Sequence, residues 1–268
     1  MGFFRRSRPP ADETAPPGPP APDFAAAALG QIAPGSRFRA SSLTGGRSDA
    51  YSVELDGDDA ELLWERLIAG NHDGWWPILI GNNLDEQGLA QSALFAAPVD
   101  SITAEAASID VPELLQRWTR DSQPDPSDEF DYIGEWPASL VAPHGLYVPR
   151  DLRTLEPQPT VIAIVAVPDQ SLVPAAIGFG GWNSCPRSAE HVAVLRYWNQ
   201  SHGARLISMS SDVVEMVAGR PPATRDQAMR LAAEHFAYCS DIVYQGVGTV
   251  SDLAASLLDA PNWYFWWD

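Results

Sequence analysis

The sequence predicts an α+β protein in which a mixed sheet carries packed helices. Residues 51–55 alternate between apolar and polar side chains, as a half-buried strand does. Residues 161–167 form a continuous apolar run, which is typical of a central strand buried on both faces. Between and after these segments lie amphipathic stretches that begin at helix-capping residues. The chain has 268 residues, 45% of them hydrophobic and 19% charged, which is a globular composition.

The chain divides into a tail and two regions. Residues 1–24 are rich in proline and alanine and are predicted to be disordered, with ordered structure beginning near Phe24. A solvated leader is favoured over a ligand for a proline-binding groove. Residues 25–155 are expected to form an N-terminal α+β region, and residues 156–268 a C-terminal domain.

The N-terminal region begins with the strand that contains Tyr51, Val53 and Leu55. A helix should follow, capped by Asp58 and ended by Gly70.

Further along this region, residues 75–80 read as a strand. Pro77 lacks an N–H group, so we expect an edge strand or the start of a strand. A second helix should follow Asp110, with Pro112 in its first turn. Residues 121–135 hold six acids and no base, which indicates an exposed loop. A calcium site is the alternative, but the spacing does not match an EF-hand loop.

The C-terminal domain has clearer boundaries. Its predicted elements, in order, are a strand at 161–167, a helix at 187–201, strands at 205–208 and 213–217, a helix from Thr224 to Tyr238, a helix opened by Thr249, and a strand at 263–267. With one helix inserted, this is the element order of a ferredoxin-like split βαβ layer.

The net charge of the chain limits the classes of partner that it can bind. The formal net charge is −18 and the pI is about 4.5, a field that repels nucleic acids and anionic lipids. We therefore predict no nucleic-acid and no membrane partner, and a basic protein partner if there is one. The chain contains no lysine, which excludes a Schiff-base lysine and a P-loop lysine. This bias, with the abundant alanine and proline, suggests a GC-rich bacterial genome.

The expected compartment is the cytoplasm. Two cysteines, Cys185 and Cys239, cannot form a disulfide framework. The arginines near the N-terminus precede no apolar segment of the kind found in a signal peptide. The run at 161–167 is too short to span a bilayer.

Several aromatic-rich sequence motifs resemble those of a known family. They are Phe179–Pro186, Glu190–Trp198, Arg220–Arg225, Phe236–Ile242 and Trp263–Asp268. In this order they resemble the bacterial family called domain of unknown function 4253, over about residues 160–268. The resemblance implies a bacterial source and supports the C-terminal domain, but it brings no activity, substrate or catalytic residue with it.

The first candidate site is a glycine-rich turn that runs from Gly178 to Pro186 and leads into a helix. A thiol near a helix N-terminus has a lowered pKa and can act as a nucleophile, so Cys185 is a candidate, with His191 as its base. The alternative is that the turn and the cysteine serve packing, since cysteine is among the most buried residue types. No other catalytic motif occurs.

The second candidate is a zinc site. His235 and Cys239 are spaced i, i+4, and together with Cys185 and His191 they would supply a Cys₂His₂ ligand set. Their spacings match no standard zinc motif, and a buried histidine beside a buried cysteine is the plainer interpretation. We therefore predict no metal and no cofactor.

Four further residues are candidates for binding. Trp182 and Asn183 lie in the glycine-rich turn, which could present backbone N–H groups to an anion. Trp198 shares a helical stripe with His191, and Arg220 could bind a carboxylate or a phosphate, or pair with one of the many acids.

The last candidate is the aromatic C-terminal strand. Trp263, Phe265 and Trp267 should share one face, and Tyr264 and Trp266 the other. If both faces are covered, this is the last strand of the core, which is the favoured interpretation. If one face is open, it is an interaction surface.

Together these observations favour a non-enzymatic protein-binding module, for example an acidic inhibitor of the immunity type. The alternatives are a cysteine-dependent hydrolase or transferase using Cys185 and His191, and a small-ligand sensor built on the glycine-rich turn.

Overall fold

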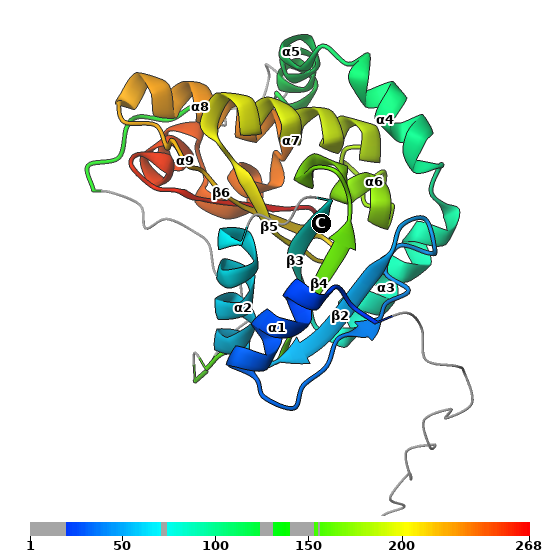
Figure 1. Ribbon diagram of the computed structural model, residues 1–268. Coiled ribbons are helices and arrows are strands. Elements are labelled where there is room, and N and C mark those ends of the chain that lie inside the picture. Colours follow the sequence, from blue (N-terminus) through cyan, green and yellow to red (C-terminus); the bar gives the residue numbers. More distant parts are fainter. Residues whose placement is uncertain (1–19, 71–73, 124–130, 140–152, 155) are drawn as a thin grey trace, which may run out of the picture.

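The protein, described here by a computed structural model, is built on a single mixed sheet (Figure 1). The structure describes residues 20–70, 74–123, 131–139, 153–154 and 156–268. The sheet has seven strands in the order β1-β2-β4-β3-β5-β6-β7, with helices against both faces, which confirms the α+β class.

The strands are β1 (Arg39–Ala40), β2 (Ala50–Leu55), β3 (Trp75–Gly81), β4 (Thr160–Ala166), β5 (Arg205–Met209), β6 (Val213–Val217) and β7 (Asn262–Trp266). The helices are α1 (Asp23–Ile32), α2 (Gly57–Ala69), α3 (Asn83–Phe95), α4 (Val99–Ala107), α5 (Val111–Ser122), the 3₁₀ turn η1 (Gln170–Leu172), α6 (Val173–Ile177), α7 (Ser188–His202), α8 (Arg225–Tyr238), the π-helical η2 (Ile242–Val247) and α9 (Val250–Leu257).

The sheet consists of two antiparallel blocks that meet at one parallel pairing. Strands β1, β2, β4 and β3 form the first block and β5, β6 and β7 the second, and β3 pairs with β5 in parallel at Leu79 and Ser208. Both of the regions predicted from the sequence contribute strands to this sheet.

The ferredoxin-like arrangement predicted for the C-terminal part is wrong. A split βαβ layer needs its first two strands to be parallel and separated by another strand of the same layer. Here β4 and β5 run antiparallel, and β3, from the N-terminal part of the chain, lies between them. The elements that were predicted follow one another in the predicted order, although η1, α6 and η2 were missed. This order does not reveal the insertion of an earlier strand.

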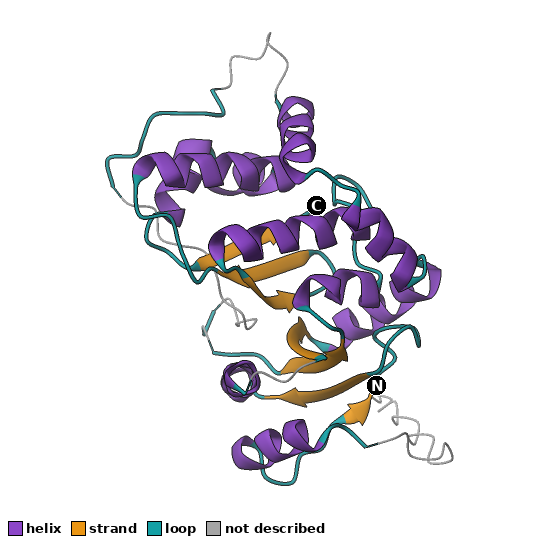
Figure 2. Cartoon of the chain, turned by 45° about the horizontal axis from the view of Figure 1, so that its top comes forward, coloured by secondary structure: helices purple, strands orange, loops and turns teal. Residues whose placement is uncertain are grey.

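The alternation of side chains along β4 divides the core into two layers. Ile162 and Ile164 point to a smaller layer beneath α1 and α2. Val161, Ala163 and Val165 point to the larger layer, which the later helices cover. Figure 2 shows the sheet between these two sets of helices. The continuous apolar run is explained by burial on both faces.

The interpretation of Pro77 as an edge residue or a strand start is also wrong, because β3 lies between β4 and β5. Indole groups supply hydrogen bonds at this end of the strand. Trp64 Nε1 donates to the carbonyl of Pro77 at 3.1 Å, and Trp76 Nε1 donates to that of Leu206 on β5 at 3.0 Å. Strand β3 pairs with β5 further along its length, at Leu79. Pro77, which has no N–H group to donate, therefore interrupts little of the hydrogen-bond ladder.

The helix caps agree with the sequence at three of four predicted positions. The side chains of Asp110, Thr224 and Thr249 accept N–H bonds at the starts of α5, α8 and α9. In α2 the cap is Asp56, and Asp58 lies in the first turn. Helices α3 and α4 were not predicted, although Asn82 and Asp85 form a full capping box at α3.

Three predictions concern the ends and loops of the chain. Helix α1 begins at Asp23, next to the expected Phe24. Residues 1–19 of the predicted tail and residues 124–130 of the acidic run lie outside the described residues.

Of the helices that the structure does describe, none has both the length and the apolar character needed to cross a bilayer.

Candidate functional site

The glycine-rich turn after α6 folds tightly onto the start of α7. Gly178, Gly180 and Gly181 all have positive φ angles. A Cβ atom on Gly180 would lie 2.2 Å from the carbonyl oxygen of Pro186 and 2.7 Å from the ring of His191. Only glycine fits there, because any side chain would collide with the backbone that carries the next part of the turn.

This turn brings Cys185 into contact with His191. The Cys185 Sγ lies 3.4 Å from His191 Nε2, and His191 Nδ1 lies 2.5 Å from the hydroxyl of Tyr238 on α8. We refer to these three side chains as the Cys-His-Tyr chain. The sequence therefore identified a thiol and an imidazole that do meet, and it missed the tyrosine that orients the imidazole.

The Cys-His-Tyr chain has the electrostatic environment of a buried core. Cys185, His191 and Tyr238 are 5%, 0% and 2% exposed. Burial raises the pKa of the Cys185 thiol, although a hydrogen bond from the Gly181 backbone acts against it. Burial also lowers the pKa of His191 to about 3 and raises the pKa of Tyr238. All three groups are uncharged at neutral pH, whereas a nucleophilic cysteine needs a stabilised thiolate.

The four proposed zinc ligands do not form one site. Cys239 donates its thiol to the carbonyl of Trp266 at 2.9 Å, and His235 packs against Trp198, Trp263 and Phe265. Within the described ranges, no three side chains of histidine, cysteine, aspartate or glutamate are grouped so that they could hold a metal ion.

The predicted binding residues Trp182, Asn183 and Trp198 all make contacts within the fold. Asn183 adopts a φ of 46° and donates to the backbone carbonyl of Asp268 at 2.9 Å, which fastens the turn to the C-terminus. Trp182 packs edge-on against Phe179, with ring centroids 4.9 Å apart. Trp198 is fully buried and donates to Glu234 at 2.8 Å.

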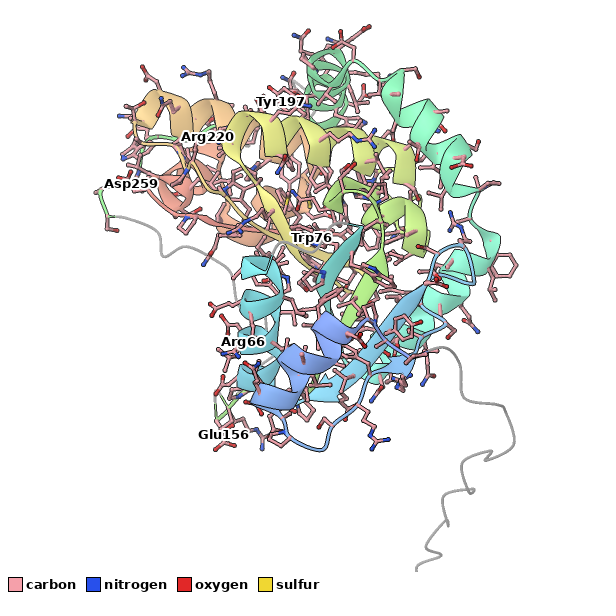
Figure 3. The ribbon with its side chains drawn as sticks, in the orientation of Figure 1. Arg66, Trp76, Glu156, Tyr197, Arg220 and Asp259 are labelled. Carbon is pink, nitrogen blue, oxygen red and sulfur yellow. The ribbon has the colours of Figure 1, made fainter. Side chains whose placement is uncertain are left out.

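Arg220 is exposed and lines an open hollow. It donates to the carbonyl of Gln200 at 2.8 Å, and the hollow has a volume of about 460 Å³. Arg230, Glu234 and Tyr197 also line it. Figure 3 labels Arg220 and Tyr197 near the end of α7. The carboxylate of Glu234 opposes anion binding here, so the role predicted for Arg220 stays a prediction.

The C-terminal strand has one buried and one partly open face. Trp263, Phe265 and Trp267 are at most 2% exposed and join the core, so the favoured interpretation, in which both faces are covered, holds for this face. Tyr264 and Trp266 are half-buried and line a pocket.

The sequence did not identify the apolar surface at the end of α3. Leu94 and Phe95 are 66% and 89% exposed. Beside them is a hollow of about 350 Å³, which Phe95 lines together with Ile102, Gly180 and Arg187. We call Leu94, Phe95 and this hollow the α3 surface. Consecutive large apolar residues at a helix end were the available signal, but the helix itself was not predicted.

The C-terminal part of the chain matches a known family model. Residues 161–268 match the family model described as Domain of unknown function (DUF4253), which confirms the resemblance. No curated protein and no solved structure matches the chain. The matched segment contains β4 to β7 and the whole Cys-His-Tyr chain, while Leu94 and Phe95 precede it.

Proposed function

We propose that this protein is a non-enzymatic binding protein of the bacterial cytoplasm, and that it docks a protein partner on the α3 surface. The observation that carries the proposal is the exposure of Leu94 and Phe95 beside a hollow. Contiguous exposed apolar side chains next to a concavity are typical of protein-binding sites, because their burial by a partner is favourable.

The proposed partner is basic. The net charge of −18 attracts a positively charged protein over a distance and repels acidic ones. An inhibitor of the immunity type, which neutralises a basic enzyme, would combine such a field with an apolar docking site. The charge supplies steering and selectivity, and the apolar residues supply affinity.

A cysteine-dependent hydrolase or transferase is the second candidate, and the 3.4 Å contact between Cys185 and His191 favours it. The burial of both groups disfavours it. A brief pulse of iodoacetamide at neutral pH separates the two proposals. A binding protein leaves Cys185 unmodified in the folded state, whereas fast, selective alkylation of Cys185 would support the enzyme.

Affinity capture from the cells that make the protein tests the docking site. We expect the wild-type chain to capture a basic protein in stoichiometric amount, and Phe95→Asp to lose it. Leu62→Asp is the matched control, because Leu62 is 46% exposed on α2 and lies away from the α3 surface. If Phe95→Asp captures the same protein as well as Leu62→Asp does, the α3 surface is not the docking site.

A further inference from the structure

Strand β7 ends the sheet, and a pocket lies along its free edge. The backbone of Trp267 donates to Asp212 at 3.1 Å and that of Ala218 donates to Pro261 at 2.7 Å. Odd-numbered residues around β7 therefore bond towards β6, and Tyr264 and Trp266 direct their backbone groups to the other side. The pocket on that side has a volume of about 210 Å³.

The walls of the pocket are mainly apolar. They come from β7, from η2 and from α9, and include Ile242, Leu253 and Leu257 as well as the two half-buried aromatic residues Tyr264 and Trp266. For scale, an engineered cavity of about 150 Å³ lined by aliphatic and aromatic side chains binds benzene. A one-ring or two-ring aromatic molecule is therefore of the right size.

One nitrogen atom of a histidine in the lining has no hydrogen-bond partner among the described residues. His235 is 1% exposed, and its Nε2 atom has no hydrogen-bond partner in the part of the chain that the structure describes. A buried polar atom without a partner costs about 1–3 kcal/mol, so a ligand group that reached Nε2 of this lining residue would remove that cost.

The charges around the pocket limit what it can bind. Burial lowers the pKa of His235 well below its usual value, so the ring is neutral at pH 7 and attracts no anion. Burial, together with the nearby charges of Glu215 and Asp212, raises the pKa of Tyr264 to about 12. These carboxylates also disfavour an anionic ligand, and the apolar walls disfavour an ion of either sign.

From this geometry we propose that the pocket binds a small, uncharged aromatic molecule that forms one hydrogen bond with His235. The site is separate from the α3 surface, so the inference stands whether or not a protein docks there. It gives the chain a second binding activity, for a small molecule.

Indole and indene are suitable probes, because the two bicyclic molecules have nearly the same shape and only indole carries an N–H donor. Two variants test the site. His235→Phe keeps the ring packing on Trp198, Trp263 and Phe265 and removes the nitrogen atoms. Gly246→Leu fills the pocket. Gly246 has an ordinary φ, and a Cβ atom there would lie 3.8 Å from the nearest atom, so the backbone tolerates a side chain.

Titration of the full-length protein, followed by NMR and by thermal unfolding, gives the outcome. We expect indole to bind the wild-type chain and raise its Tm, with about tenfold weaker binding to His235→Phe, and indene to bind both forms equally. Gly246→Leu should bind neither probe. The proposal is overturned if the wild-type chain does not bind indole, if Gly246→Leu binds it unchanged, or if His235→Phe does not weaken it.

Discussion

A thiol, an imidazole and a phenol in contact become reactive only where their charged forms are stabilised. In the Cys-His-Tyr chain they are buried among aromatic rings, with the ring centroids of Phe179 and Trp267 at 5.0 Å and 5.6 Å from that of His191. Their hydrogen bonds then satisfy buried polar atoms and join the glycine-rich turn to α8. The same contact that suggests catalysis is explained by packing.

Replacing Tyr238 by Phe tests this structural role. The change removes the hydroxyl that contacts His191 Nδ1 and leaves that nitrogen buried without a partner. We expect the free energy of unfolding to fall by about 1–3 kcal/mol, measured by urea denaturation.

Tyr244→Phe is the control for this variant. The hydroxyl of Tyr244 donates to the carbonyl of Ser122 at 2.6 Å, but the residue is 38% exposed, so water can replace the bond. The loss there should be about 0.5 kcal/mol or less. Equal losses at both positions would show that the Tyr238 hydroxyl has no special structural role.

The two buried histidines predict how stability depends on pH. The folded state holds His191 and His235 neutral because burial lowers the pKa of each ring, while the unfolded chain binds a proton near pH 6.5. Below pH 6.5 the unfolded state binds more protons, so stability falls with acidification. Between pH 7 and pH 5 the loss should be about 2 kcal/mol for each histidine.

Urea denaturation at the two pH values measures this loss, and His235→Phe should halve it. The depressed pKa of Glu86 does not interfere, because its contribution is lost only as the pH falls further, through that low pKa. A stability that stays constant between pH 7 and pH 5 would contradict the burial of these rings.

For single residues, the sequence predicted which side chains could act in catalysis or binding, but not what surrounds them. The six-residue spacing of Cys185 and His191 across a tight turn made their contact foreseeable. The contact of His191 with Tyr238 spans 47 residues and depends on how α7 and α8 pack. Burial also decides the sign of each pKa shift, and it is a property of the whole core.

Helix α3 is attached to the sheet through a buried carboxylate. Its Glu86 is 6% exposed and accepts hydrogen bonds from Arg39, Ser41 and Ser52, at 2.6 Å, 2.7 Å and 2.6 Å. Burial acts to raise the pKa of Glu86, but these bonds outweigh it and lower the pKa overall. This polar anchor fixes one end of α3, while Leu94 and Phe95 at the other end stay in solvent.

Glu86→Ala should therefore loosen α3. It leaves the hydroxyl of Ser52 buried without its acceptor, and we expect a loss of about 3 kcal/mol in the free energy of unfolding. Glu105→Ala is the control, because the ion pair of Glu105 with Arg187 is about half exposed and should contribute less than about 1 kcal/mol. Losses of similar size would contradict the role of Glu86 as an anchor.

The C-terminal strand β7 should be required for folding. Deletion of residues 263–268 removes three buried aromatic residues, each worth about 3–5 kcal/mol, against a total stability of about 5–15 kcal/mol. We expect no folded protein on expression, whereas deletion of Asp268 alone should be tolerated. A truncated chain that stays folded by circular dichroism would contradict the place of β7 in the core.

The elements differ in how well the sequence revealed them. Strand β4 was predicted because an apolar run of seven residues has few other interpretations. Helix α3 was missed because its apolar residues do not follow one stripe: Leu89 and Ala93 are buried, while Leu84 and Leu94 are exposed. A helix that keeps part of its apolar surface for solvent lacks the periodicity by which helices are recognised.

In the whole molecule, strands from distant parts of the chain make one sheet. The parallel pairing of β3 with β5 joins the first antiparallel block to the second. It cannot be read from the sequence, because it depends on which strand edges remain free after the local hairpins have formed. As a result, α4 and α7 come into contact and the α3 surface combines residues from both parts of the chain.

The proposed docking of a basic protein on the α3 surface should change hydrogen exchange locally. Hydrogen–deuterium exchange of the full-length chain, with and without the captured partner, tests it most directly. We predict that binding slows exchange over residues 84–97 and in the turn at 178–181, and leaves α1 and α2 unchanged. Protection confined to α1 and α2, with no change over residues 84–97, would show that the partner does not dock on the α3 surface.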